Sequence, residues 1–202
     1  LKKLLAMNPT SALGQRELAD KYYDTKNYKE AVVEYAKYVK NPNHFKQDED
    51  RYAFLLFFSG DYKAGYDFAT KLLTENPANF TAQRYQFMNA AQMPEMKDQL
   101  LPMAEALVAN HNETNRFAAI DYTLIADEFK NAKQYDKAIA VLEEGIKEMP
   151  ENASFYKSLA MLYVEQNQIA KAADTYKGYI ANLANPGFND KSQYATFCYY
   201  GA

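Results

Sequence analysis

The sequence predicts an all-α protein built of repeated helix-turn-helix units. Two observations lead to this prediction. Large and small apolar residues recur with a spacing of 34 residues, so that Tyr122 and Ala126 return as Tyr156 and Ala160. Every segment between turn residues also carries the apolar period of a helix rather than that of a strand.

The same pattern extends toward the N-terminus. The small residue of the first helix appears again at Ala19 and Ala53, and proline closes units at Pro77 and Pro150. Period and residue types together resemble the tetratricopeptide repeat, whose unit is a helix, a turn and an antiparallel helix. The resemblance implies a right-handed superhelical α-solenoid that presents a concave surface to another protein.

Turn residues divide the chain into about five such repeats, with partial units at both ends. The repeats are expected at residues 12–45, 46–79, 80–118, 119–152 and 153–187, with partial units at 1–11 and 188–202. The expected helix pairs are 12–25 with 28–40, 47–58 with 62–75, 80–92 with 97–110, 115–131 with 135–148, and 153–166 with 169–183. We expect a single solenoid domain over residues 1–202, and the half-repeats at its ends predict a fragment of a longer chain.

Small residues are predicted where the two helices of a pair cross closely, with large residues one turn away that interlock. The pairs are Ala19 with Ala31, Ala53 with Gly65, Ala126 with Ala138, and Ala160 with Ala172.

The third repeat departs from this pattern. Phe87 stands at the position of the small residue, and five extra residues separate this repeat from the next. They belong either to the turn at residues 93–95 or to the segment after Val108. Flexible thioethers suit an irregular core, with an adaptable binding surface as the alternative. Four of the seven methionines gather here, namely Met88, Met93, Met96 and Met103.

Composition excludes several classes of function. The chain has 23 Lys and Arg against 26 Asp and Glu, a net charge of −3, and neither sign forms a long block. Nucleic-acid binders carry a basic stripe, so no nucleic-acid partner is expected. The longest apolar run, residues 52–58, is far shorter than the ~20 residues that cross a bilayer, so we expect no transmembrane segment. Residues 1–7 are too short an apolar stretch for a signal peptide, which leaves cytoplasm and bacterial periplasm both open.

No catalytic motif is present. His44 and His111, the two histidines, fall near helix ends or loops without a Ser or Cys motif beside them. The chain lacks Gly-rich phosphate loops, paired cysteines and the HExxH pattern. The acidic run at 47–50 lacks the alternating ligands and glycine of a calcium loop and is read as a solvated helix start. We therefore predict no enzyme activity, no metal site and no cofactor.

The single cysteine and the many tyrosines are assigned to packing. Cys198 aligns with the apolar positions Tyr22 and Leu56 of earlier repeats, and is expected to fill the core as a small hydrophobe, with a reactive thiol as the alternative. Most of the eighteen tyrosines also fall on packing positions. This register argues against their use as exposed stacking platforms for sugars or bases.

The resemblance also implies where a partner would bind. In tetratricopeptide proteins the concave groove is lined by four positions of each first helix. Transferred to this chain, the predicted groove comprises Arg16, Asp20, Tyr23, Asp50, Phe54, Phe57, Arg84, Met88, Asp127, Lys130, Lys157 and Met161. Phe54, Phe57 and Met88 are expected at its apolar centre, with the packing of Phe54 and Phe57 against the neighbouring repeat as the alternative. No asparagine stands at the positions of a chaperone carboxylate clamp, so such a clamp is disfavoured and a segment anchored by apolar side chains fits better.

The sequence therefore predicts a non-catalytic scaffold that binds a protein or peptide segment in this groove. Two alternatives remain open at this stage. One is a glycan-binding, tetratricopeptide-like protein of a bacterial cell envelope. The other is the regulatory array of a larger enzyme. The sequence predicts neither the identity of the partner nor the oligomeric state.

Overall fold

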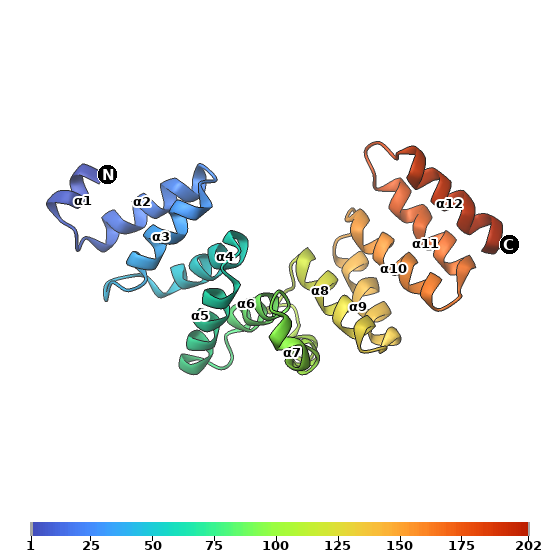
Figure 1. Cartoon of the computed structure of the whole chain (residues 1–202), viewed down its shortest axis with the longest axis horizontal. Helices are drawn as coiled ribbons and strands as arrows, with labels where there is room; N and C mark the ends of the chain where they lie inside the picture. The colour runs from blue at the N-terminus through green and yellow to red at the C-terminus, as the bar shows by residue number, and fades with distance from the viewer. Residues whose placement is uncertain (1, 202) are drawn as a thin grey trace. The chain divides into compact units, whose positions relative to one another are not determined.

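The computed structural model describes residues 2–201, which form α-helices joined by turns without any strand (Figure 1). The all-α, helical-repeat fold class predicted from the sequence is confirmed. Contacts divide the chain into two compact units, with unit 1 extending to Met103 and unit 2 beginning at Ala104. No helix within residues 2–201 is long and apolar enough to cross a membrane.

Unit 1 contains two complete helix pairs and the start of a third. Its elements are α1 (Lys2–Met7), α2 (Ala12–Asp24), α3 (Tyr28–Tyr38), α4 (Glu49–Ser59), α5 (Tyr62–Glu75), α6 (Phe80–Ala90) and the first half of α7 (Lys97–Asn110), with 3-10 turns at Lys46–Asp48 and Pro94–Met96. Side-chain caps fix three of the helix starts, because Ser11, Asp61 and Asn79 accept from the backbone N–H groups of Gly14, Ala64 and Ala82. The chain leaves α4 through Gly60, whose φ of 83° favours glycine.

Unit 2 is likewise built of successive helix pairs. It contains the second half of α7 followed by α8 (Ala119–Asn131), α9 (Tyr135–Glu148), α10 (Ala153–Glu165), α11 (Ile169–Ala181) and α12 (Phe188–Gly201). The expected start of α8 at residue 115 is wrong. Asn112 accepts from the backbone N–H groups of Thr114 and Asn115, which holds this stretch in a turn, and Asp121 accepts from the N–H of Ala118 at 2.7 Å. The helix therefore begins only at Ala119.

The irregular third repeat has long connections on both sides of α7. Residues 91–96 separate α6 from α7, and residues 111–118 separate α7 from α8. The turns inside the other helix pairs are shorter. Three of the four methionines of this region are buried, which favours the irregular core over an adaptable surface: they are Met88, Met93 and Met96.

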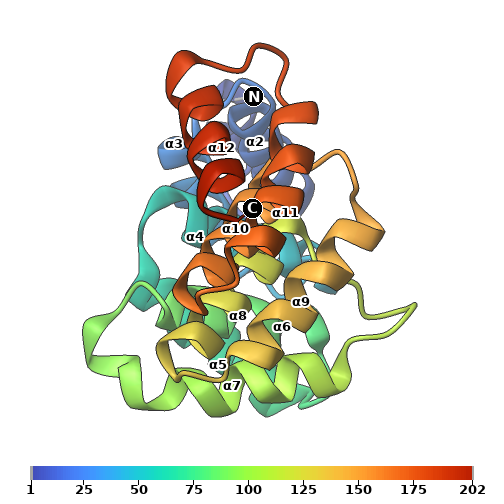
Figure 2. The ribbon, with the colours of Figure 1, turned by 90° about the vertical axis from the view of Figure 1, so that its right-hand side faces the viewer.

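Cys198 is a corrected prediction. The register placed it in the core, but it is exposed, and its neighbour Phe197 is buried instead. Figures 1 and 2 both show α12 lying beside α11. The Phe197 ring meets the Tyr176 ring edge to face, with 5.3 Å between centroids. This contact sets the rotation of α12 one residue away from the expected register.

The acidic start of α4 is a second correction. Asp48 and Glu49 are 4% and 6% exposed, so these two residues are not solvated as the sequence suggested, whereas Gln47 and Asp50 of the same run are exposed. Asp48 accepts hydrogen bonds from Arg16 Nε at 2.6 Å and from the Tyr38 hydroxyl at 2.8 Å. Glu49 lies 3.0 Å from His44 Nε2. Both carboxylates are buried because polar groups from α2, α3 and the preceding loop surround them.

The small residues at the helix crossings are all buried, as predicted. Ala160 is fully buried in α10. We expect Ala160→Leu to lower the free energy of unfolding by about 2 kcal/mol, because the added carbons have no free space between α10 and its neighbours. Urea unfolding followed by circular dichroism measures this loss. Ala140→Leu, at an exposed position of α9, is the matched control, and equal effects at the two sites would contradict the packing.

Candidate functional site

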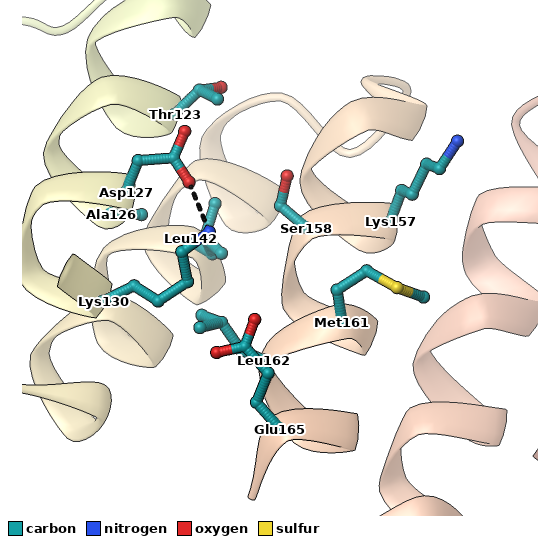
Figure 3. Close-up of a pocket in the computed structure, with 10 residues that line it drawn as sticks. All are labelled: Thr123, Ala126, Asp127, Lys130, Leu142, Lys157, Ser158, Met161, Leu162 and Glu165. Carbon is teal, nitrogen blue, oxygen red and sulfur yellow. Dashed lines mark hydrogen bonds and ion pairs between the residues drawn. The ribbon is translucent and has the colours of Figure 1, made fainter. Parts of the chain in front are cut away.

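Unit 2 contains a pocket between α8 and α10, with a volume of about 240 Å³ (Figure 3). Helix α8 supplies one wall, α10 the other, and Leu142 of α9 closes the bottom. The lining residues are Thr123, Ala126, Asp127, Lys130, Leu142, Lys157, Ser158, Met161, Leu162 and Glu165. The spacing of three to four residues along each helix places these side chains on one helix face.

The base of the pocket is apolar. Ala126, Leu142 and Leu162 are buried there, and Met161 lies half-buried beside them on α10. The small side chain of Ala126 contributes little volume to the α8 wall. The base can therefore hold an aliphatic or aromatic side chain and remove its apolar surface from water.

The rim of the pocket is charged. Lys130 Nζ lies 3.2 Å from Asp127 Oδ1, a pair within α8 that Figure 3 shows as a dashed line. Lys157 Nζ lies 5.3 Å from the centre of the Tyr179 ring, a cation–π contact. Among the described residues, no ion pair within 4.0 Å involves Lys157 or Glu165. Two of the four rim charges are therefore compensated by each other and two are not.

The side chains of the pocket suit a ligand that has both apolar and charged groups. The pocket contains no histidine or cysteine, and no group of three or more metal-ligating side chains occurs in the described part of the chain. Its groups are two amines, two carboxylates, two hydroxyls and apolar carbon. Such a set can hold an apolar group in the base and complement charges at the rim.

Unit 1 brings another part of the predicted groove together. The rings of Tyr23 and Phe54 meet edge to face, with 5.9 Å between their centroids, and the Phe54 and Phe58 rings pack with 4.3 Å between their centroids. Arg51 was not among the predicted site residues. Its guanidinium lies 5.5 Å from the centre of the Tyr23 ring, and its Nη1 lies 2.7 Å from Asp20 Oδ1. The lone arginine in an aromatic stretch was the sequence feature that could have identified it.

Arg16 and Asp20 are held in a polar network rather than left free for a partner. Arg16 Nε lies 4.0 Å from Asp20 Oδ2 and 2.6 Å from Asp48 Oδ2. The Tyr35 hydroxyl donates to Asp20 and accepts from Arg51, and burial is the main reason that the pKa of Tyr35 is raised. This network links α2, α3 and α4.

The remaining predicted residues of unit 1 do not form a common surface. Phe57 and Met88 are only 8% and 1% exposed, and so lie in the core. Asp50 is exposed, while Arg84 is half-buried with its guanidinium 5.8 Å from the centre of the Tyr85 ring. The twelve-residue groove as a whole stays a prediction, and the pocket of unit 2 collects four of its members: Asp127, Lys130, Lys157 and Met161.

Comparisons with known proteins agree with this fold. Residues 131–195 match the family model of the tetratricopeptide repeat, so the resemblance inferred from the sequence is confirmed. The matched segment covers α9, α10 and α11 and most of α12. A comparison with curated proteins gave no match.

Solved tetratricopeptide-like structures superpose on most of the chain. MamA from Desulfovibrio magneticus RS-1, from residue 41 to its end, is 18% identical with a TM-score of 0.69, over 85% of this chain and 94% of that one. A thermophilic TPR protein of Thermus thermophilus is 14% identical with a TM-score of 0.62, over 94% of this chain and 100% of that one. At these identities the similarity shows the fold alone.

Proposed function

We propose that this chain is a non-catalytic scaffold that binds a protein or peptide segment, with the pocket between α8 and α10 as an anchoring site. One observation carries the proposal. Four of the positions that the sequence predicts to face a partner lie together in a single pocket, which has an apolar base and a charged rim. Helical-repeat proteins commonly use such surfaces for protein partners. Peptide recognition in grooves depends on a few apolar anchors, with the charged neighbours adding specificity.

Met161→Glu tests this proposal. Peptides are first selected from a random display library on the intact chain, and their affinities are measured by fluorescence anisotropy. We expect Met161→Glu to weaken binding about tenfold or more, because a carboxylate beside the apolar base opposes the entry of an apolar anchor. Ala140→Glu, at an exposed position of α9 outside the pocket, introduces the same charge and is expected to bind like the native chain.

The comparison of the two variants decides the outcome. Circular dichroism and the unfolding transition confirm that both variants remain folded. Selected peptides that bind the two variants equally well would show that the pocket is not the anchoring site, and the proposal would then be wrong.

Glycan binding is a second candidate, favoured by the aromatic cluster of unit 1. Phe58 is 49% exposed beside Phe54 and Tyr23, and exposed aromatic faces can stack on sugar rings. Arg51 lies against the Tyr23 ring in the same cluster. A screen of the chain against an oligosaccharide array distinguishes the two candidates, because a peptide scaffold gives no saturable sugar binding.

A further inference from the structure

The two uncompensated charges of the pocket lie at opposite ends of it. Lys157 and Glu165 are both on α10, and Figure 3 shows Lys157 near the upper end of this helix segment and Glu165 near the lower end. Eight residues separate them, which corresponds to about 12 Å along the helix axis at 1.5 Å per residue. The pocket therefore has a positive end and a negative end.

The other rim charges do not cancel this polarity. Asp127 and Lys130 face each other at 3.2 Å and form a neutral pair on the opposite wall. The Tyr179 ring beside Lys157 attracts the ammonium group without neutralising its charge. An occupant that lies along α10 therefore meets an uncompensated ammonium group at one end and an uncompensated carboxylate at the other.

The size of the pocket indicates a single side chain as the buried anchor. Its volume of about 240 Å³ is below the ~300–1,000 Å³ of pockets that enclose whole small ligands. An extended peptide advances about 3.3 Å per residue. Two of its side chains therefore span ~12 Å when they are about four residues apart, with the anchor midway between them.

We propose that the pocket selects an extended peptide with an acidic side chain at Lys157, a basic side chain at Glu165 about four residues away, and an aliphatic side chain between them over Leu142 and Leu162. The chain direction of the peptide is free, because the charges and not the backbone define the match. This inference rests on the proposed function and adds the chemistry of the partner. Charge complementarity across a rim contributes specificity more than affinity.

Three peptide classes test the inference on the intact chain. Each contains a central leucine, and the flanking charges are acid and base, acid and acid, or base and base, at a spacing of four residues. Affinities are measured by fluorescence anisotropy at low ionic strength. We expect the acid–base class to bind about threefold to fivefold more tightly than either of the others, since each mismatched rim charge costs about the energy of one exposed ion pair.

Charge reversal assigns each end of the pocket. Lys157→Glu is expected to shift the preference to the base–base class, and Glu165→Lys to the acid–acid class. Lys177→Glu, at an exposed position of α11 outside the pocket, is the control and is expected to keep the acid–base preference. A general charge effect would shift Lys157→Glu and Lys177→Glu alike toward the base–base class, because both variants change the net charge by the same amount.

The outcomes separate the inference from the proposed function. If all three classes bind with equal affinity and Met161→Glu abolishes this binding, the charge inference is wrong and the anchoring site stands. A preference for charges eight residues apart indicates a helical occupant and overturns the extended form. Absence of binding by every class, or binding that Met161→Glu leaves unchanged, overturns the inference together with its basis.

Discussion

Replacing Phe57 with alanine is expected to lower the free energy of unfolding of unit 1 by about 3 kcal/mol, as the truncation of a buried phenylalanine does. Phe57 is only 8% exposed. Its ring packs on the rings of Phe58 and Tyr62, with 5.1 Å and 5.8 Å between ring centroids. The removal of the Phe57 ring therefore leaves a cavity between α4 and α5. Urea unfolding followed by circular dichroism measures the loss.

Phe58→Ala is the matched control because it removes the same ring from the next position. Phe58 is 49% exposed, so we expect its truncation to cost about 1 kcal/mol or less. The sequence placed Phe57 at the apolar centre of a partner groove. A loss of peptide binding by Phe57→Ala without a change in stability would restore that assignment and contradict the core position.

The repeat period located most helices well, because the features that end a helix are local. Asn27, Gly60 and Asn167 lie in turns between helices, and the crossing residues are small in every regular pair. Helix α8 was misplaced since the side chains of Asn112 and Asp121 hold the preceding loop and helix start. Hydrogen bonds of this kind follow from the folded geometry and not from the apolar period.

The transferred groove positions work best where the repeat is regular. Helices α8 and α10 follow the repeat pattern, and their predicted positions meet in one pocket. Helix α6 does not follow the pattern, since the four consecutive residues from Phe87 to Ala90 are all buried and leave no exposed face in that turn. A Cβ added to Gly65 would collide with the side chain of Asn89, which shows how closely α5 and α6 approach there. Met88 is therefore a core residue, and a rule based on one exposed face fails.

Long-range partners explain the remaining error. The acidic run at 47–50 was assigned to a solvated helix start because carboxylates suit a helix N-terminus and the spacing does not fit a calcium loop. The residue that neutralises Asp48 is Arg16, which lies 32 residues away on α2. A sequence shows both charges but not their contact, so burial of the carboxylate could not be predicted.

Removing the Asp48 carboxylate is the other change with a large expected effect. We expect Asp48→Ala to lower the free energy of unfolding of unit 1 by about 3 kcal/mol at pH 7, since it leaves Arg16 and the buried Tyr38 hydroxyl without their acceptor. The Tyr38 hydroxyl also accepts from the backbone N–H of Phe45, so the loop before α4 depends on the same group. Asp67→Ala is the control, because Asp67 forms an exposed pair with Lys63 and its loss is expected to cost less than about 1 kcal/mol.

The contribution of Asp48 should also depend on pH in a defined direction. Burial by itself raises the pKa of Asp48, but the hydrogen bonds from Arg16 and Tyr38 outweigh it and hold the pKa below its usual value of 3.8. A carboxylate with a lowered pKa in the folded state stabilises the fold above its unfolded pKa, and this stabilisation is lost as the pH falls through the folded value. Unfolding measured between neutral and acidic pH should therefore show a smaller loss for Asp48→Ala than for the native chain. If both chains lose the same stability as the pH falls from 4 toward 2, a range set by the usual pKa of about 3.8 for an aspartate, the Asp48 carboxylate is not stabilised by Arg16 and Tyr38 in solution.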